Sequence, residues 1–133
     1  MSIDAIRYVR LGYVGLNVTN MEASVNFYET LVEMESPEAL DAIEAHLTSI
    51  GIACAPVSDA ETQALRIGRA FRMTEPTTGA TFEFYSEMAA APEAYHPTHT
   101  QIARLGHVVL SSPDREATEA FLMDHMNFRV SDR

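Results

Sequence analysis

The opening of the chain has the apolar and polar pattern of a strand followed by a helix. Residues 8–18 are rich in Val, Leu and Tyr and alternate loosely between apolar and polar positions, which indicates a strand. Thr19 and Asn20 are candidate N-caps, and the apolar residues behind them recur at helical spacing. We therefore expect a helix that ends at about Val32.

A second helix and a short strand are predicted next. Ser36 can cap a helix, Pro37 suits its first position, and Gly51 is a suitable C-terminal stop. The residues between them place an apolar side chain every three or four positions, as an amphipathic helix does. Residues 52–57 are mostly apolar and predict a strand that leaves this helix.

The rest of the first two thirds of the chain predicts a loop, a hairpin and a linker. Residues 58–68 are polar and are expected to form a loop. Residues 69–87 predict two strands joined by a turn. The turn is expected at residues 76–79, because its first residue is Pro76 and its last is Gly79. Two prolines and many small residues between 88 and 103 predict a linker.

Two segments of the chain, residues 10–27 and residues 104–121, have nearly the same sequence, which we call the repeated phrase. RLGYVGLNVTNMEASVNF begins at Arg10, and RLGHVVLSSPDREATEAF begins 94 residues later at Arg104. Agreement over this length without a gap favours two related strand–helix units over two unrelated units with similar patterning. The second copy replaces Tyr13 with His107, a residue that can bind a metal.

The second copy predicts a strand over residues 105–110 and a helix from a cap at Ser112 or Asp114 to about Met126. A lone strand–helix unit cannot bury its own apolar face, and an unpaired edge strand tends to find another chain. We therefore expect a strand exchange or a symmetric homodimer in which residues 104–128 dock on a neighbouring module.

Composition and charge narrow the classes of function. The 133 residues suit one ordinary domain, and 47% hydrophobic residues allow a real core. A formal net charge of −10 disfavours binding to nucleic acid or to anionic membranes. The single cysteine, Cys54, excludes an intrachain disulfide and is expected to be a buried small apolar residue. Without a signal peptide or a long apolar run, the expected location is cytoplasmic.

The repeated phrase resembles the vicinal oxygen chelate superfamily, which includes glyoxalase I, bleomycin-resistance proteins and the type I extradiol ring-cleaving dioxygenases. Residues 104–121 are similar to the opening of the catalytic domain of an extradiol dioxygenase, and residues 10–18 to the opening of its metal-free amino-terminal domain. Residues 36–51 and 75–87 resemble the second half of that amino-terminal domain. The resemblance implies an α+β fold of βαβββ modules, with a mixed, curled sheet and flanking helices.

The sequence also departs from the family. Several strands would lie between Val32 and Ser36 in the family, whereas here the first predicted helix runs almost directly into the second. The resemblance therefore implies a shortened amino-terminal-type module at 1–87, a linker at 88–103, and an incomplete second module at 104–133. That second module would consist of the first strand and helix of a catalytic-type module.

The function that the resemblance implies is Fe(II)-dependent cleavage of a catechol-type aromatic ring by O₂. Such iron is held by two His and one carboxylate, with positions left open for a small aromatic substrate and O₂. His107 matches the family's first metal His, whereas Tyr13 holds the equivalent position in the metal-free module. The family's other two ligands would lie in a module beyond Arg133, so the resemblance implies an incomplete active site in this chain.

Glu83 is the second candidate metal ligand. It lies in the strand TFEFYSE, and in glyoxalase-like modules the last inward position of this strand is a carboxylate ligand. One alternative function is therefore a glyoxalase- or bleomycin-resistance-like dimeric protein that binds a metal or a small molecule, with Glu83 and His107 sharing the ion. Another is a non-catalytic fragment that only dimerises. For Glu83 itself, the alternative that we favour over a metal ligand is a solvent-facing residue between two core phenylalanines.

The other four histidines carry weaker signals. His96 and His99 form HPTH in the predicted linker, where two histidines without a third nearby donor make a poor metal site. His46 and His125 lie late in predicted helices and are expected to face water.

Overall fold

One mixed β-sheet organises the part of the chain that the structure describes. The computed structural model describes residues 8–15, 29–90, 92–93 and 109–130. The strands within these residues are β1 (Tyr8–Gly15), β2 (Glu29–Met34), β3 (Ala55–Pro56), β4 (Ala70–Thr74) and β5 (Thr81–Tyr85). The helices there are α2 (Pro37–Ser49), α3 (Asp59–Leu65) and α4 (Arg115–Met126).

The strand order is β1-β2-β5-β4-β3. The central pair, β2 and β5, is parallel, and the other neighbouring strands are antiparallel. In chain order β2, α2, β3, β4 and β5 form a βαβββ arrangement, with α3 inserted between β3 and β4. This arrangement confirms the predicted α+β fold class and its βαβββ module.

The strand β2 corrects the prediction that a helix ends at about Val32. Leu31, Val32 and Met34 are all buried in β2, between β1 on one side and β5 on the other. A parallel strand with both faces covered is apolar at successive positions, so it lacks the alternation that identifies a half-exposed strand. The chain therefore passes from a strand, not from a helix, into α2.

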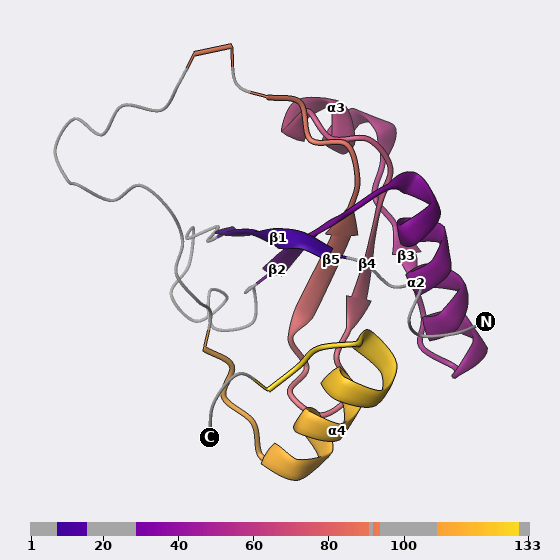
Figure 1. Cartoon of the computed structure of the whole chain (residues 1–133), viewed down its shortest axis with the longest axis vertical. Coiled ribbons are helices and arrows are strands. Elements are labelled where there is room, and N and C mark those ends of the chain that lie inside the picture. The colour runs from indigo at the N-terminus through magenta and orange to yellow at the C-terminus, as the bar shows by residue number, and fades with distance from the viewer. Residues whose placement is uncertain (1–7, 16–28, 91, 94–108, 131–133) are drawn as a thin grey trace, which may run out of the picture.

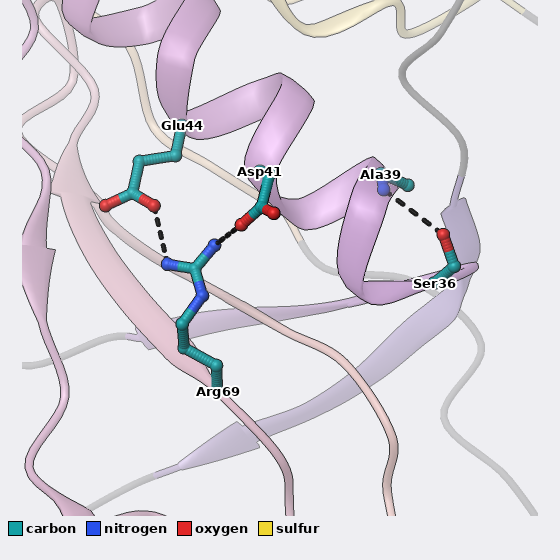
Figure 2. Close-up of polar contacts among 5 residues, drawn as sticks. All are labelled: Ser36, Ala39, Asp41, Glu44 and Arg69. Carbon is teal, nitrogen blue, oxygen red and sulfur yellow. Dashed lines mark hydrogen bonds and ion pairs between the residues drawn. The ribbon is translucent and has the colours of Figure 1, made fainter.

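The helix α2 forms where its caps predict it. The Ser36 hydroxyl oxygen accepts a hydrogen bond of 3.2 Å from the backbone N–H of Ala39 (Figure 2), and Pro37 opens the helix. Gly51 follows the C-cap with φ of +85°, a conformation that glycine adopts at little cost. The cap signals in the sequence thus fixed both ends of this helix.

The predicted loop at 58–68 is wrong over most of its length, because α3 lies there. The Ser58 hydroxyl oxygen accepts a hydrogen bond of 3.3 Å from the backbone N–H of Glu61. Ser-x-x-Glu is the sequence pattern of a capping box, and this local signal identifies the start of α3. The strand predicted at 52–57 shortens to the two residues of β3.

The hairpin of β4 and β5 is confirmed, together with its turn. The turn closes through backbone hydrogen bonds from Glu75 to Ala80 (2.8 Å) and from Gly79 to Glu75 (2.9 Å). Gly79 has φ of +73°, which explains a glycine at this position. β5 returns beside β2 and so completes the sheet.

The main apolar core lies between the sheet and α2. Phe71, Phe82 and Phe84 from β4 and β5 pack in one cluster with Leu40 and Ile43 of α2. A smaller cluster lies on the opposite face of the sheet and contains Leu31, Val57, Ala70 and Tyr85. The alternation of side chains along β4 and β5 assigns neighbouring residues to these two faces.

The helix α4 packs on this same core. Asp114 is its N-cap and Met126 its last residue, as predicted, and Phe121 and Met126 are buried in the cluster that contains α2. Figure 1 shows α4 near the end of the sheet where β4 turns into β5, whereas α3 lies at the opposite end. The apolar face of this helix is thus buried within the chain. The homodimer itself stays a prediction.

One arginine ties the start of β4 to the exposed side of α2. Nη1 of Arg69 donates a hydrogen bond of 2.5 Å to Oε2 of Glu44, and its other terminal nitrogen pairs with Asp41 (Figure 2). All three side chains are substantially exposed to solvent. Exposed ion pairs of this kind contribute about 0–1 kcal/mol to stability.

Candidate functional site

The candidate ligand Glu83 lies in the middle of the sheet, on the face opposite α2. In the strand register it stands between Leu31 of β2 and Arg72 of β4. Its neighbours along β5, Phe82 and Phe84, point into the α2 core. Glu83 itself is wholly buried, so the expectation that it is a solvent-facing residue is wrong.

An arginine on the neighbouring strand holds this carboxylate. Both Nε and Nη2 of Arg72 lie 2.7 Å from Oε2 of Glu83, so the guanidinium contacts one carboxylate oxygen with two nitrogens. Nη2 also lies 2.5 Å from Oε1 of Glu61 in α3. A buried charge needs such a partner, because an uncompensated charge in an apolar interior is costly.

The residues of this face do not form a metal site by themselves. Among the described residues, no three His, Cys, Asp or Glu side chains are grouped so as to hold a metal ion. Glu83 already pairs with a guanidinium, and that positive charge would repel a divalent cation at the same oxygen. The described part of this face therefore fits a charge pair better than it fits a metal.

Most of the other residues singled out in the sequence lie outside the described part. The positions of His107, His96 and His99 all fall outside the described residues, whereas Tyr13 belongs to β1. The predicted approach of His107 to Glu83 therefore stays a prediction. The second copy of the repeated phrase is described only from Val109 onward, and there the helix α4 follows as expected.

Two histidines that were expected to face water lie against each other instead. His46 of α2 and His125 of α4 have ring centres 5.7 Å apart, and both are partly buried. Sequence patterning missed this pair because the contact depends on how two helices distant in sequence pack. A pattern along one helix shows only which side its own residues share.

A cavity of about 350 Å³ lies beside α4. Its apolar lining residues include Leu110, Leu122 and Phe128, and its charged lining residues are Arg115, Glu119 and Arg129. Met123 and Val130, which also line it, are among the exposed large apolar side chains. This surface was not predicted from the sequence.

Within the described ranges, no helix combines the length and the apolar character needed to cross a lipid bilayer.

Solved structures of other proteins share this fold. No family model matches the sequence, and no curated protein matches it. The chain superimposes with a TM-score of 0.67 on a halotolerant catechol dioxygenase at 18% identity, covering 78% of this chain and 37% of that one. A catechol 2,3-dioxygenase gives a TM-score of 0.66 at 18% identity, with 86% and 57% covered. The Mn(II)-bound glyoxalase from Novosphingobium aromaticivorans gives 0.62 at 24% identity, with 78% and 34% covered.

These similarities show that the chain shares the fold of two catechol dioxygenases and of a glyoxalase. The chain spans between 34% and 57% of the length of these solved structures. Fold alone does not determine function, because one fold carries many different sites.

Proposed function

We propose that this chain is part of an Fe(II)-dependent extradiol dioxygenase that opens a catechol-type aromatic ring with O₂. In this proposal residues 1–87 are a metal-free amino-terminal-type module and residues 104–133 begin a catalytic-type module, joined by the linker at 88–103. His107 is the iron ligand that the chain supplies. The other iron ligands come from a further module or from a second copy of the chain.

The pairing of Glu83 with Arg72 is the observation that carries this proposal. A glyoxalase-like module would present a carboxylate to the metal from the strand that contains Glu83. Here that carboxylate is buried and pairs with a guanidinium at 2.7 Å. A module whose central carboxylate is occupied in this way suits a supporting role, which leaves metal binding to His107.

The fold of catechol-cleaving relatives supports the same proposal. Two of the similar structures are a halotolerant catechol dioxygenase and a catechol 2,3-dioxygenase. A third is 2,2′,3-trihydroxybiphenyl 1,2-dioxygenase from Sphingomonas wittichii strain RW1, with a TM-score of 0.61 at 20% identity. We infer from these a small aromatic substrate of the catechol type.

A second candidate function is a glyoxalase- or bleomycin-resistance-like homodimer that binds a metal or a small molecule. The position of the Glu83 carboxylate on the face opposite α2 favours it, because carboxylate oxygens are common ligands of divalent metal ions. In this alternative Glu83 leaves Arg72 and joins His107 of a second copy around one divalent ion. A non-catalytic module is the remaining possibility.

Anaerobic calorimetric titration with Fe(II) and with Mn(II), which measures metal binding directly, separates these functions. The wild-type chain is compared with the His107→Gln and Glu83→Gln variants, and circular dichroism checks that each variant is folded. The dioxygenase proposal expects Fe(II) binding that His107→Gln abolishes and Glu83→Gln retains. Oxygen uptake with catechol as substrate then tests for ring cleavage.

The other outcomes are equally definite. Loss of binding in both variants supports the shared glyoxalase-like site and overturns the dioxygenase assignment of Glu83 as a supporting residue. No binding in the wild type overturns the shared glyoxalase-like site and also the version of the dioxygenase proposal in which a second copy of the chain supplies the other iron ligands. Light scattering tests the homodimer, and a monomer at every concentration contradicts it.

A further inference from the structure

The contact between α2 and α4 brings two imidazole rings together. His46 lies in the last turn of α2, and His125 lies in the last turn of α4. Their ring centres are 5.7 Å apart and their planes make an angle of 32°. The ring of Phe121 lies 5.6 Å from the His125 ring and provides an apolar neighbour.

Each ring has a buried nitrogen without a hydrogen-bond partner in the part of the chain that the structure describes. These atoms are Nε2 of His46 and Nδ1 of His125. Buried polar atoms of native proteins normally have a partner, so an unsatisfied pair of this kind calls for an explanation. Two such nitrogens on facing helices suggest a shared ligand that accepts electron pairs from both.

The spacing of the rings suits one shared ion. Zinc binds an imidazole nitrogen at about 2.0–2.1 Å, so two rings that share an ion have centres roughly 5–6.5 Å apart. The observed 5.7 Å lies inside this range. The absence of a three-donor cluster among the described residues makes this a two-histidine site, in which water completes the coordination.

We propose that His46 and His125 bind a transition-metal ion of the zinc type and thereby fasten α4 to α2. This site uses neither His107 nor Glu83, so it is independent of the proposed dioxygenase chemistry. An ion that binds only the folded chain stabilises it by RT ln(1 + L/Kd), where L is the concentration of the ion, so the stabilisation grows with that concentration relative to the Kd. Bound metal would therefore hold the beginning of the second module against the βαβββ module.

Zinc titration of four proteins by calorimetry tests the proposal: the wild type, His46→Gln, His125→Gln and the control His99→Gln. We expect one Zn²⁺ per chain in the wild type and in the control. Affinity should fall by about tenfold or more in either of the other two variants, since changes even to groups that only support metal ligands cost about 10–100-fold. Equal affinity in all four proteins, or no binding in the wild type, overturns the proposal.

A measurement on the wild type alone removes any dependence on how the variants fold. Long-range ¹H–¹⁵N spectra report the nitrogens of all five histidines, and Zn²⁺ should shift Nε2 of His46 and Nδ1 of His125. Unshifted signals for these two atoms, or a hydrogen bond between the rings that persists with zinc, overturn the proposal. Repeating the titration with His107→Gln separates this site from the proposed iron site, because zinc binding should survive that change.

Discussion

The two faces of the sheet use the same strands in opposite ways. On the α2 side, Phe71, Phe82 and Phe84 form part of a continuous apolar core. On the other side, the matching row contains Arg72 and Glu83, a charge pair inside the sheet. Neighbouring residues of β5 therefore lie in different environments, one in aromatic packing and the next in an ion pair, because successive side chains point to opposite faces.

The two faces differ in how much their side chains contribute to the stability of the fold. Apolar packing gains free energy with few geometric demands, whereas a buried ion pair gives back most of its Coulomb energy as the cost of removing both charges from water. A protein that needed only stability would do as well with apolar residues at both positions. The pair therefore marks the face on which this module departs from plain packing.

The largest expected effect comes from breaking the aromatic face. The Phe84 ring is wholly buried and stacks on Phe71 at a centroid distance of 5.2 Å. Phe84→Ala removes this contact and leaves a cavity, so the free energy of unfolding should fall by about 3–5 kcal/mol. Urea denaturation measures the change, with the more exposed Met123→Ala as control, expected within about 0.5 kcal/mol of the wild type. A loss below about 1 kcal/mol for Phe84→Ala would contradict the assignment of this core.

An intermediate effect is expected on the charged face. Glu83→Ala leaves the Arg72 charge without its buried partner, which typically costs about 3–5 kcal/mol. Arg72 also contacts Glu61 near the surface, so we expect the lower end of this range. Glu61→Ala, which removes the more exposed carboxylate, should cost at most about 1 kcal/mol. Equal losses in the two variants would show that burial does not distinguish the two carboxylates.

A double variant sharpens the comparison of faces. Replacing both partners, Arg72→Met with Glu83→Leu, should restore most or all of the stability lost in Glu83→Ala, because apolar replacements of buried pairs are often neutral or stabilising. Thermal unfolding of the double variant beside both single variants checks this. A double variant less stable than Glu83→Ala would instead indicate that the pair contributes net stability.

Local signals in the sequence identify several elements well. The caps Ser36 and Asp114 gave the starts of α2 and α4, and Gly79 gave the turn of the hairpin, because these effects act within a few residues. The prediction failed for β2, where burial on both faces removes the alternation of a strand. It also failed for α3, although Ser58 and Glu61 provide a usable capping signal.

The candidate site was less predictable than the fold. The sequence pointed to Glu83 as a special carboxylate, but Arg72 becomes its partner only through the register of β4 and β5. The contact between His46 and His125 depends on the packing of two helices that lie far apart in the chain. Contacts of this kind arise from tertiary structure, which a pattern along one segment does not record.

The smallest expected effect concerns Glu75, a second buried carboxylate with neutral partners. Burial raises its pKa, but hydrogen bonds from the Thr78 hydroxyl and from the backbone N–H groups of Thr78 and Thr77 outweigh this and lower the pKa below 4.5. The unfolded chain therefore binds a proton at a higher pH than the folded chain. The stabilisation is complete above about pH 4.5 and is lost as the pH falls through the folded-state value.

Glu75→Gln should accordingly lower the free energy of unfolding at pH 7 by about 1–2 kcal/mol, since the hydrogen bonds to a charged acceptor weaken. The difference from the wild type should shrink as the pH falls below 4.5, because the wild-type carboxyl becomes neutral as well. Denaturation curves at pH 7, 5 and 3 measure this trend, with Glu35→Gln, an exposed change, as control. A difference that stays constant with pH would mean that the shape of the Glu75 side chain, and not its negative charge, stabilises the turn. Buried charge in this module would then matter mainly where Arg72 meets Glu83.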